Sequence, residues 1–188
     1  CAVPDGDLFK SIRSGKAVMV TDHIDRFTEN GIKLKSGEEL DADIIITATG
    51  LNAAILHNIS FEVDGGKIDI GKTFCYKGMM LSGVPNFAFS MGYTNASWTL
   101  KSDLVGQYVA RLLNYMNDKS FQQCMPTVPE QGMEVEAMMD FTSGYVLRSI
   151  DSMPKQGKHK PWRLYQNYIL DRISLGAGSV NDSSIYFS

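Results

Sequence analysis

The chain has 188 residues, the size of one ordinary domain or of two small ones. Its composition, 44% hydrophobic and 21% charged, supplies enough apolar side chains for a core and excludes a disordered tail. The net charge of -3 argues against nucleic acid as a partner, because binding to phosphates requires an excess of basic side chains. No apolar run approaches the roughly 20 residues that span a bilayer, so contact with a membrane is not predicted.

The chain opens at Cys1 without an initiator methionine and without the basic and apolar segments of a signal peptide. We therefore expect it to be part of a longer protein. Its three cysteines, Cys1, Cys75 and Cys124, are far apart and form no CxxC pair, which predicts free thiols in a reducing cytoplasm. The three histidines are equally dispersed, so neither a metal site nor a catalytic set is predicted within the chain.

Short elements are predicted early in the chain. Residues 5–15 favour a helix, because Asp5 or Asp7 can cap its first N–H groups. Residues 17–20 favour a strand. Alternating apolar and polar residues on either side of a Ser-Gly turn predict a hairpin over 31–40, with one face exposed to water.

Residues 43–50 (DIIITATG) form a run rich in β-branched side chains, which is typical of a strand buried on both faces, as in a parallel sheet. The strand ends at Gly50, where a backbone or a ligand can approach closely. Ligands of open α/β sheets bind beyond the carboxyl ends of such strands. An ordinary core strand followed by a glycine turn explains the same residues and is favoured on this pattern alone.

The centre of the chain is predicted to hold a hairpin, a strand and a long helix. Asp64-Gly65-Gly66 provides the hairpin turn, and residues 87–91 favour a strand that ends at Gly92. Apolar side chains then recur at spacings of three and four, which predicts an amphipathic helix. Its apolar face consists of Leu100, Leu104, Val105, Tyr108, Val109, Leu112, Leu113 and Met116.

The start of this helix is a candidate binding site. Asn95, Ser97 and Thr99 are all suitable N-cap residues. A strand, a glycine turn and a helix N-terminus together can bind an anionic or electron-rich edge of a ligand, because free N–H groups point there. An ordinary capped helix explains the local pattern equally well.

Beyond residue 118 the sequence is looser. A short helix is predicted over 134–141, and a second helix is predicted to begin at Pro161. Its apolar face would hold Tyr165, Ile169 and Ile173. The stretch from Lys155 to Arg163 holds four cations and no acid, which favours a solvated loop; a loop that contacts phosphate or a partner is the alternative. The four cations are Lys155, Lys158, Lys160 and Arg163.

Several motifs together resemble one family. Residues 41–50 match a D-x-(apolar)-x-A-T-G strand, and the block at 76–101 is more specific. The segments 153–157 and 166–168, with Pro161-Trp162 between them, complete the likeness. Over essentially its whole length the chain resembles the C-terminal part of class B flavin monooxygenases of the Baeyer–Villiger type, in the ethionamide-activating subgroup.

The resemblance implies a flavoprotein that uses NADPH to reduce FAD. A flavin C4a-peroxide then inserts one oxygen atom from O2 into ketones or oxidises sulfur or nitrogen. The implied fold is α/β, with two Rossmann-like dinucleotide-binding domains. Residues 1–50 would be the tail of the NADPH-binding domain and a linker strand, 51–117 would belong to the FAD-binding domain, and 118–188 would pack across both.

The resemblance also implies roles for single residues. Two end the linker strand beside the cofactors, Thr49 and Gly50. Three would lie along the flavin, with backbone N–H groups facing its pyrimidine oxygen: Tyr93, Thr94 and Asn95. Ser97 and Trp98 would border the pocket for a small ketone or thioether substrate, and residues 155–160 would approach the NADPH side.

The family's GxGxxG motif for FAD, its F-x-G-x-x-x-H-x-x-x-W fingerprint and its second glycine motif are absent from these 188 residues. We therefore expect the chain alone to be inactive, and to contact the missing N-terminal half of the same protein or to self-associate as a homo-oligomer. Two alternatives remain open at this stage. One is a flavin monooxygenase of the same build that oxidises amines or sulfides, and the other is a non-catalytic α/β binding module.

Overall fold

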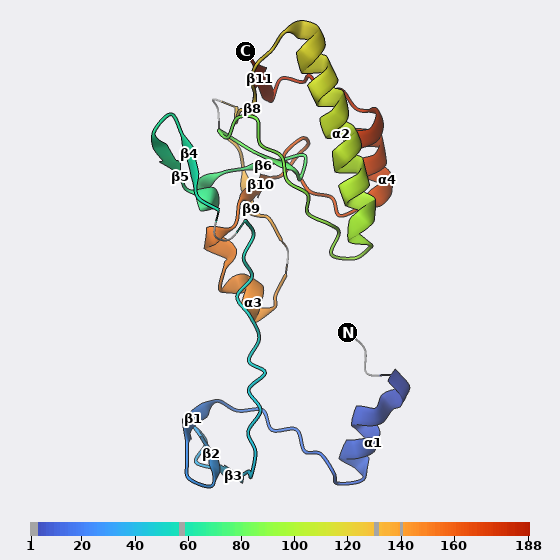
Figure 1. Ribbon diagram of the computed structural model, residues 1–188. Helices are drawn as coiled ribbons and strands as arrows, with labels where there is room; N and C mark the ends of the chain where they lie inside the picture. The colour runs from blue at the N-terminus through green and yellow to red at the C-terminus, as the bar shows by residue number, and fades with distance from the viewer. Residues whose placement is uncertain (1–3, 57–58, 130–131, 140) are drawn as a thin grey trace. The chain divides into compact units, whose positions relative to one another are not determined.

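The computed structural model describes residues 4–56, 59–129, 132–139 and 141–188 (Figure 1). The chain divides into two compact units, Cys1–Thr49 and Gly50–Ser188. The described residues contain short 3-10 turns at Pro4–Gly6, Ile70–Lys72 and Ile150–Ser152 in addition to the helices and strands given below. No described helix has both the length and the apolar character needed to cross a membrane.

The first unit contains one helix and a three-stranded antiparallel sheet. Helix α1 spans Asp7–Arg13, and the strands follow in the spatial order β1 (Ile24–Phe27), β2 (Gly31–Leu34) and β3 (Glu39–Asp41). The predicted helix and hairpin are confirmed, although the helix is capped by Gly6 in a left-handed conformation and not by an aspartate side chain. The predicted strand over 17–20 is wrong, because no described strand pairs with it.

The predicted buried strand over 43–50 is also wrong. This segment is extended but unpaired, and Ile44 and Ile46 are 80% and 84% exposed. A strand buried on both faces needs a neighbour on each side for its N–H and C=O groups and cover above and below. None of the described strands supplies either to residues 43–50. The apolar side chains of Ile44 and Ile46 therefore have no packing partners among the described residues.

The second unit contains two-stranded antiparallel pairs. The predicted hairpin at Asp64-Gly65-Gly66 is confirmed, and two pairs join segments that are distant in sequence. The pairs are β4 (Phe61–Val63) with β5 (Gly66–Ile68), β6 (Cys75–Tyr76) with β7 (Met80–Leu81), β8 (Cys124–Pro126) with β11 (Ile185–Phe187), and β9 (Val135–Ala137) with β10 (Lys155–Gly157).

The described residues form both helices and strands, which is compatible with the predicted α/β class. The parallel sheet is not confirmed, because every ladder among the described residues is antiparallel. One isolated parallel bridge joins Phe74 to Lys155. The Rossmann-like arrangement and the assignment of 1–50, 51–117 and 118–188 to nucleotide domains remain predictions.

Helix α2 (Trp98–Lys119) organises the second unit, and its predicted apolar face is largely confirmed. It lies beside α4 (Tyr168–Asp171) and the π-helical segment Arg172–Ala177 that follows, as Figure 1 shows. The core lies between α2, the β6–β7 hairpin and residues from the end of the chain. Its buried members are Tyr76, Met79, Met80, Leu104, Val105, Tyr108, Leu112, Met116, Cys124, Trp162, Leu175 and Ile185.

Three further predictions differ from the structure. Residues 87–91 form no strand, although the N–H of Phe89 donates to the carbonyl oxygen of Met79. The predicted helix over 134–141, where residue 140 lies outside the described residues, is replaced by strand β9, because its backbone pairs with β10. Helix α3 instead spans Gly144–Leu147. The helix predicted from Pro161 starts only at Tyr168, because Gln166 is left-handed at φ 51°.

Two neighbouring leucines of α2 provide a test of the core. Leu112 is 3% exposed and Leu113 is 58% exposed. We expect Leu112→Ala to lower the free energy of unfolding by about 2–5 kcal/mol, because it leaves a cavity in the core. Leu113→Ala should lower it by less than about 1 kcal/mol. Urea unfolding of both variants measures the difference, and equal losses would show that this face does not form the core.

Candidate functional site

The predicted flavin-contacting residues form a bend directly before α2. Tyr93 is buried, whereas Thr94 and Asn95 are exposed. Tyr93, Thr94 and Asn95 thus lie next to Ser97 and Trp98, at which the helix begins. Thr49 and Gly50 lie in the extended, exposed segment at the division between the two units. Gly50 has φ 84°, and nothing described lies within 4 Å of the position of a Cβ there, so backbone conformation and not a close neighbour favours glycine.

Gly92 is required where the loop turns into the helix. A Cβ on Gly92 would lie 2.1 Å from Cγ of Trp98, so the indole ring packs directly against the glycine backbone. The ring is otherwise open, with Trp98 62% exposed. Ser97 is the N-cap residue, but its Oγ lies 2.8 Å from Oγ1 of Thr99 and makes no capping bond to the helix. The first N–H groups of α2 are thus left without a side-chain cap.

Behind the loop lies a buried cluster of Tyr93, Lys101 and Asp171. The Oδ2 atom of Asp171 accepts hydrogen bonds from the Tyr93 hydroxyl (2.8 Å) and from Nζ of Lys101 (2.7 Å). The side chains of Lys101 and Asp171 are 7% and 15% exposed, so each charge depends on the other. Burial, and then the bond to Asp171, raise the pKa of Tyr93, so its hydroxyl stays protonated and donating.

Lys101 was not among the predicted site residues, but the sequence carries a signal for its buried position. Lys101 is spaced three, four and seven residues from Leu104, Val105 and Tyr108, and it therefore lies on the buried face of the helix. A single charge on an apolar helix face predicts a buried partner, because an unpaired ammonium is strongly disfavoured there. The adjacent Leu100, which was assigned to the apolar face, is exposed instead.

Gln166 holds the outer side of the loop. Its Oε1 atom accepts hydrogen bonds from the backbone N–H of Thr94 (3.0 Å) and from Oγ1 of Thr94 (3.3 Å). Its backbone carbonyl oxygen accepts from Nδ2 of Asn95 (3.1 Å). No motif in the sequence indicated this contact, because the two partners are separated by about 70 residues of chain.

A pocket of about 180 Å³ lies next to Thr94. Of the predicted site residues it includes Thr94 alone, so Ser97 and Trp98 border no part of it. Its wall is otherwise built from later segments and combines thioether and aromatic side chains with amides. These residues are Met138, Met139, Phe141, Gln156, Arg163, Leu164, Tyr165 and Gln166.

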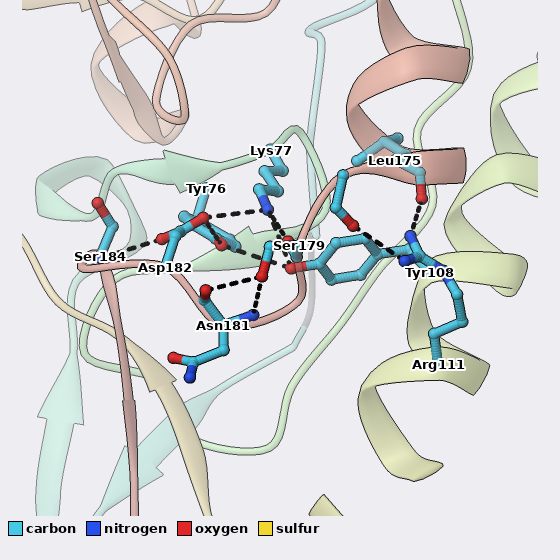
Figure 2. A network of polar contacts seen from close by, with 10 residues as sticks. Tyr76, Lys77, Tyr108, Arg111, Leu175, Ser179, Asn181, Asp182 and Ser184 are labelled. Carbon is cyan, nitrogen blue, oxygen red and sulfur yellow. Dashed lines mark hydrogen bonds and ion pairs between the residues drawn. The ribbon is translucent and has the colours of Figure 1, made fainter. Parts of the chain in front are cut away.

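A second buried polar network, shown in Figure 2, also pairs a lysine with an aspartate that accepts a tyrosine hydroxyl. The Oδ2 atom of Asp182 accepts a hydrogen bond from the Tyr76 hydroxyl (2.8 Å) and lies 3.1 Å from Nζ of Lys77. Lys77 also donates to the Tyr108 hydroxyl (3.1 Å) and to the carbonyl oxygen of Ser179 (2.9 Å). The Lys77 ammonium is thus held by two hydrogen bonds and one ion pair inside the protein, which indicates a structural role.

Arg111, further along α2, also holds the C-terminal segment of the chain against this helix. Its guanidinium donates to the carbonyl oxygens of Leu175 and Gly178 and lies 5.5 Å from the centre of the Tyr108 ring. These carbonyl groups belong to the end of the π-helical segment, where backbone acceptors lack partners within the helix. The end of the chain is thus fixed to α2 by side chains of Lys77, Lys101 and Arg111.

The cation-rich segment is mostly neutralised by acids. Nζ of Lys158 lies 2.8 Å from Oε2 of Glu134, and Nζ of Lys155 lies 4.0 Å from Oδ1 of Asp151. Arg163 forms an ion pair with Glu136. Lys160 lies over the Tyr165 ring at 5.4 Å from its centre. This pairing disfavours a phosphate-contacting loop. The predicted solvated loop is wrong for residues 155–157, which form strand β10 with Gln156 and Gly157 buried, whereas residues 158–160 are exposed.

The described cysteines are unsuited to nucleophilic chemistry. Cys75 and Cys124 are buried free thiols. Burial raises the pKa of Cys75 to about 12, and burial also raises the pKa of Cys124. Both thiols therefore stay protonated at neutral pH, and the thiolate is the reactive form. Cys1 lies outside the described residues.

The close approach at Gly92 can be tested with one methyl group. We expect Gly92→Ala to displace the Trp98 ring and to lower the free energy of unfolding by about 1–3 kcal/mol, because the ring must leave its place. Gly106→Ala is the matched control, since nothing lies within 4 Å of a Cβ there and alanine suits a helix better by up to about 1 kcal/mol. An unchanged indole N–H resonance of Trp98 in Gly92→Ala would contradict this.

The network in Figure 2 predicts a loss on removal of its carboxylate. Asp182→Asn should lower the free energy of unfolding by about 1–3 kcal/mol, because it leaves Lys77 buried without a counter-charge. Asp103→Asn, on the exposed face of α2, should change it by no more than about 0.5 kcal/mol. Urea unfolding compares the two, and a neutral Asp182→Asn would refute the dependence of Lys77 on this acid.

Known proteins that are similar to this chain match it over its whole length. It is 54% identical over 188 residues to the FAD-containing monooxygenase EthA of Mycobacterium tuberculosis and 52% identical to EthA of Mycolicibacterium smegmatis. It is 48% identical to the probable FAD-binding monooxygenase AlmA of Acinetobacter baylyi. No family model and no solved structure matches.

Each of these matches covers 100% of the chain but only 38% of the length of the relative. The matches thus span both compact units and extend beyond the motif-rich block at 76–101. Over its full length, the chain is therefore similar to a part of proteins named FAD-containing monooxygenases.

Proposed function

We propose that the chain acts within a longer monooxygenase that uses FAD and NADPH and inserts one oxygen atom into ketones, as Baeyer–Villiger enzymes do. The observation that carries the proposal is the full-length match to relatives named FAD-containing monooxygenases. Those relatives are longer than the chain, and the glycine-rich nucleotide-binding motifs are not among its 188 residues. The remainder of the protein would supply them, and the chain would supply one wall of the flavin site.

The loop before α2 fits a flavin in its donor chemistry. The uncapped N–H groups at the start of α2 would face the electron-rich pyrimidine edge, where the helix dipole stabilises negative charge. Tyr93, Thr94 and Asn95 would lie along the ring system, and Thr49 and Gly50 would approach it from the linker. FAD, reduced by NADPH, would supply the activated oxygen. The residues of the chain would bind and orient the cofactor and take no proton from the substrate.

Trp98 and Ser97 would border the substrate. The indole of Trp98 is exposed and rests on Gly92, so it offers an apolar surface at a fixed position. Such a surface suits the hydrocarbon part of a small ketone or thioether. The exposed isoleucines of the 43–50 segment would be covered by strands from the rest of the protein, which is consistent with the pattern of a strand buried on both faces.

Absorbance and product analysis test the proposal. The complete protein should carry the visible absorption bands of bound FAD, whereas the 20.8 kDa chain alone should be colourless and inactive. With NADPH and O2, a cyclic ketone should yield the lactone. Formation of a sulfoxide from a thioether, without any lactone, would assign the protein to the heteroatom-oxidising type. A complete protein that never binds FAD would contradict the proposal and favour a non-catalytic binding module.

A further inference from the structure

The loop before α2 takes its shape from a segment that lies far along the chain. Gln166 accepts both the N–H and the hydroxyl of Thr94 on its side-chain oxygen, and its backbone oxygen accepts the amide of Asn95. Asp171 accepts the hydroxyl of Tyr93. Each of the three residues predicted to lie along the flavin therefore makes a hydrogen bond to the segment 166–171.

The backbone of Gln166 is itself in an unfavourable conformation. Its φ of 51° lies in the left-handed region, which residues with a Cβ rarely adopt and which glycine and asparagine adopt most readily. Such strain persists only where surrounding contacts hold it, and it concentrates at functional sites. In this conformation the side-chain amide of Gln166 faces Thr94, and its backbone carbonyl faces the next loop residue, Asn95.

The segment that carries Gln166 is anchored on its far side. Asn167 caps α4 by accepting the N–H of Leu170, and Asp171 at the end of α4 pairs with buried Lys101 at 2.7 Å. Lys101 belongs to the first turns of α2 and lies 5.7 Å from the centre of the Tyr93 ring. Gln166 is therefore attached through α4 to the same helix whose N-terminus it helps to shape.

We propose that Gln166 is a positioning residue of the flavin site. It acts through Thr94 and Asn95 and holds the loop in the conformation that receives the cofactor. We assign no direct contact between Gln166 and the cofactor. The inference rests on the proposed function, because it assumes that the loop at 93–95 faces FAD.

Two substitutions of Gln166 separate positioning from folding. Gln166→Gly relieves the left-handed strain and removes the side-chain amide, so the loss of the contact to Thr94 is not accompanied by new backbone strain. Gln166→Glu keeps an acceptor oxygen at the same distance from the backbone and should restore the contact. Gln107→Ala, on the exposed face of α2, is the control for removal of a glutamine side chain.

The experiment measures the dissociation constant of FAD, the flavin absorption spectrum and hydrogen exchange at residues 93–98 in the complete protein. For Gln166→Gly we expect FAD to bind at least about tenfold more weakly, which corresponds to the loss of one or two hydrogen bonds. The absorption bands should shift, and exchange at 93–98 should accelerate. The melting temperature should stay within the range of Gln107→Ala, and Gln166→Glu should bind FAD like the wild type.

The outcomes distinguish this inference from the proposed function. If the wild-type protein binds FAD and Gln166→Gly binds it equally tightly with an unchanged spectrum, Gln166 has no positioning role and the proposed function stands. Equal losses in Gln166→Gly and Gln166→Glu would also overturn the role of the acceptor oxygen. If the wild-type protein binds no FAD, the proposed function itself fails and the inference fails with it.

Discussion

Two buried lysines require acids from the end of the chain. Lys101 belongs to α2 and Lys77 contacts this helix at Tyr108. Both side chains are almost inaccessible to water, and their partners are Asp171 and Asp182, respectively. An ammonium group left alone in such a place would cost several kcal/mol. The segment that carries both acids must therefore lie against α2 whenever the second unit is folded. Each carboxylate also accepts a buried tyrosine hydroxyl, which fixes its orientation.

The geometry of the candidate site follows from this attachment. Because Asp171 must reach Lys101, the preceding turn is placed over the loop before α2, and Gln166 meets Thr94 there. The loop is therefore shaped by residues outside its own sequence. Its glycine, Gly92, is needed only on the other side, where the Trp98 ring rests on the backbone. One side of the loop is thus fixed by a contact to a glycine and the other by a long-range contact to an amide.

Local patterns predicted the elements that local interactions stabilise. Helix α2 follows from its spacing of apolar residues, and the two hairpins follow from their glycine turns. The segment 43–50 was misassigned because a strand buried on both faces is defined by neighbours, and none is present among the described residues. The segment 134–141 was misassigned because pairing with β10 outweighs its weak helical pattern. The left-handed Gln166 has no sequence signature, so its contact to Thr94 could not be anticipated. The resemblance to flavin monooxygenases, by contrast, was evident from the motifs at 76–101 and is confirmed by the matches over the full length of the chain.

The separation between the lysines and their acids has a consequence for synthesis on the ribosome. The Tyr76 hydroxyl and its acceptor Asp182 are 106 residues apart in the chain. At typical elongation rates of about 5–20 residues per second, Tyr76 and Lys77 emerge roughly 5–20 s before the carboxylate that will receive them. During this interval the ammonium groups must remain hydrated, so α2 cannot yet bury its full apolar face. The second unit can thus complete its folding only after Asp182 has been synthesised.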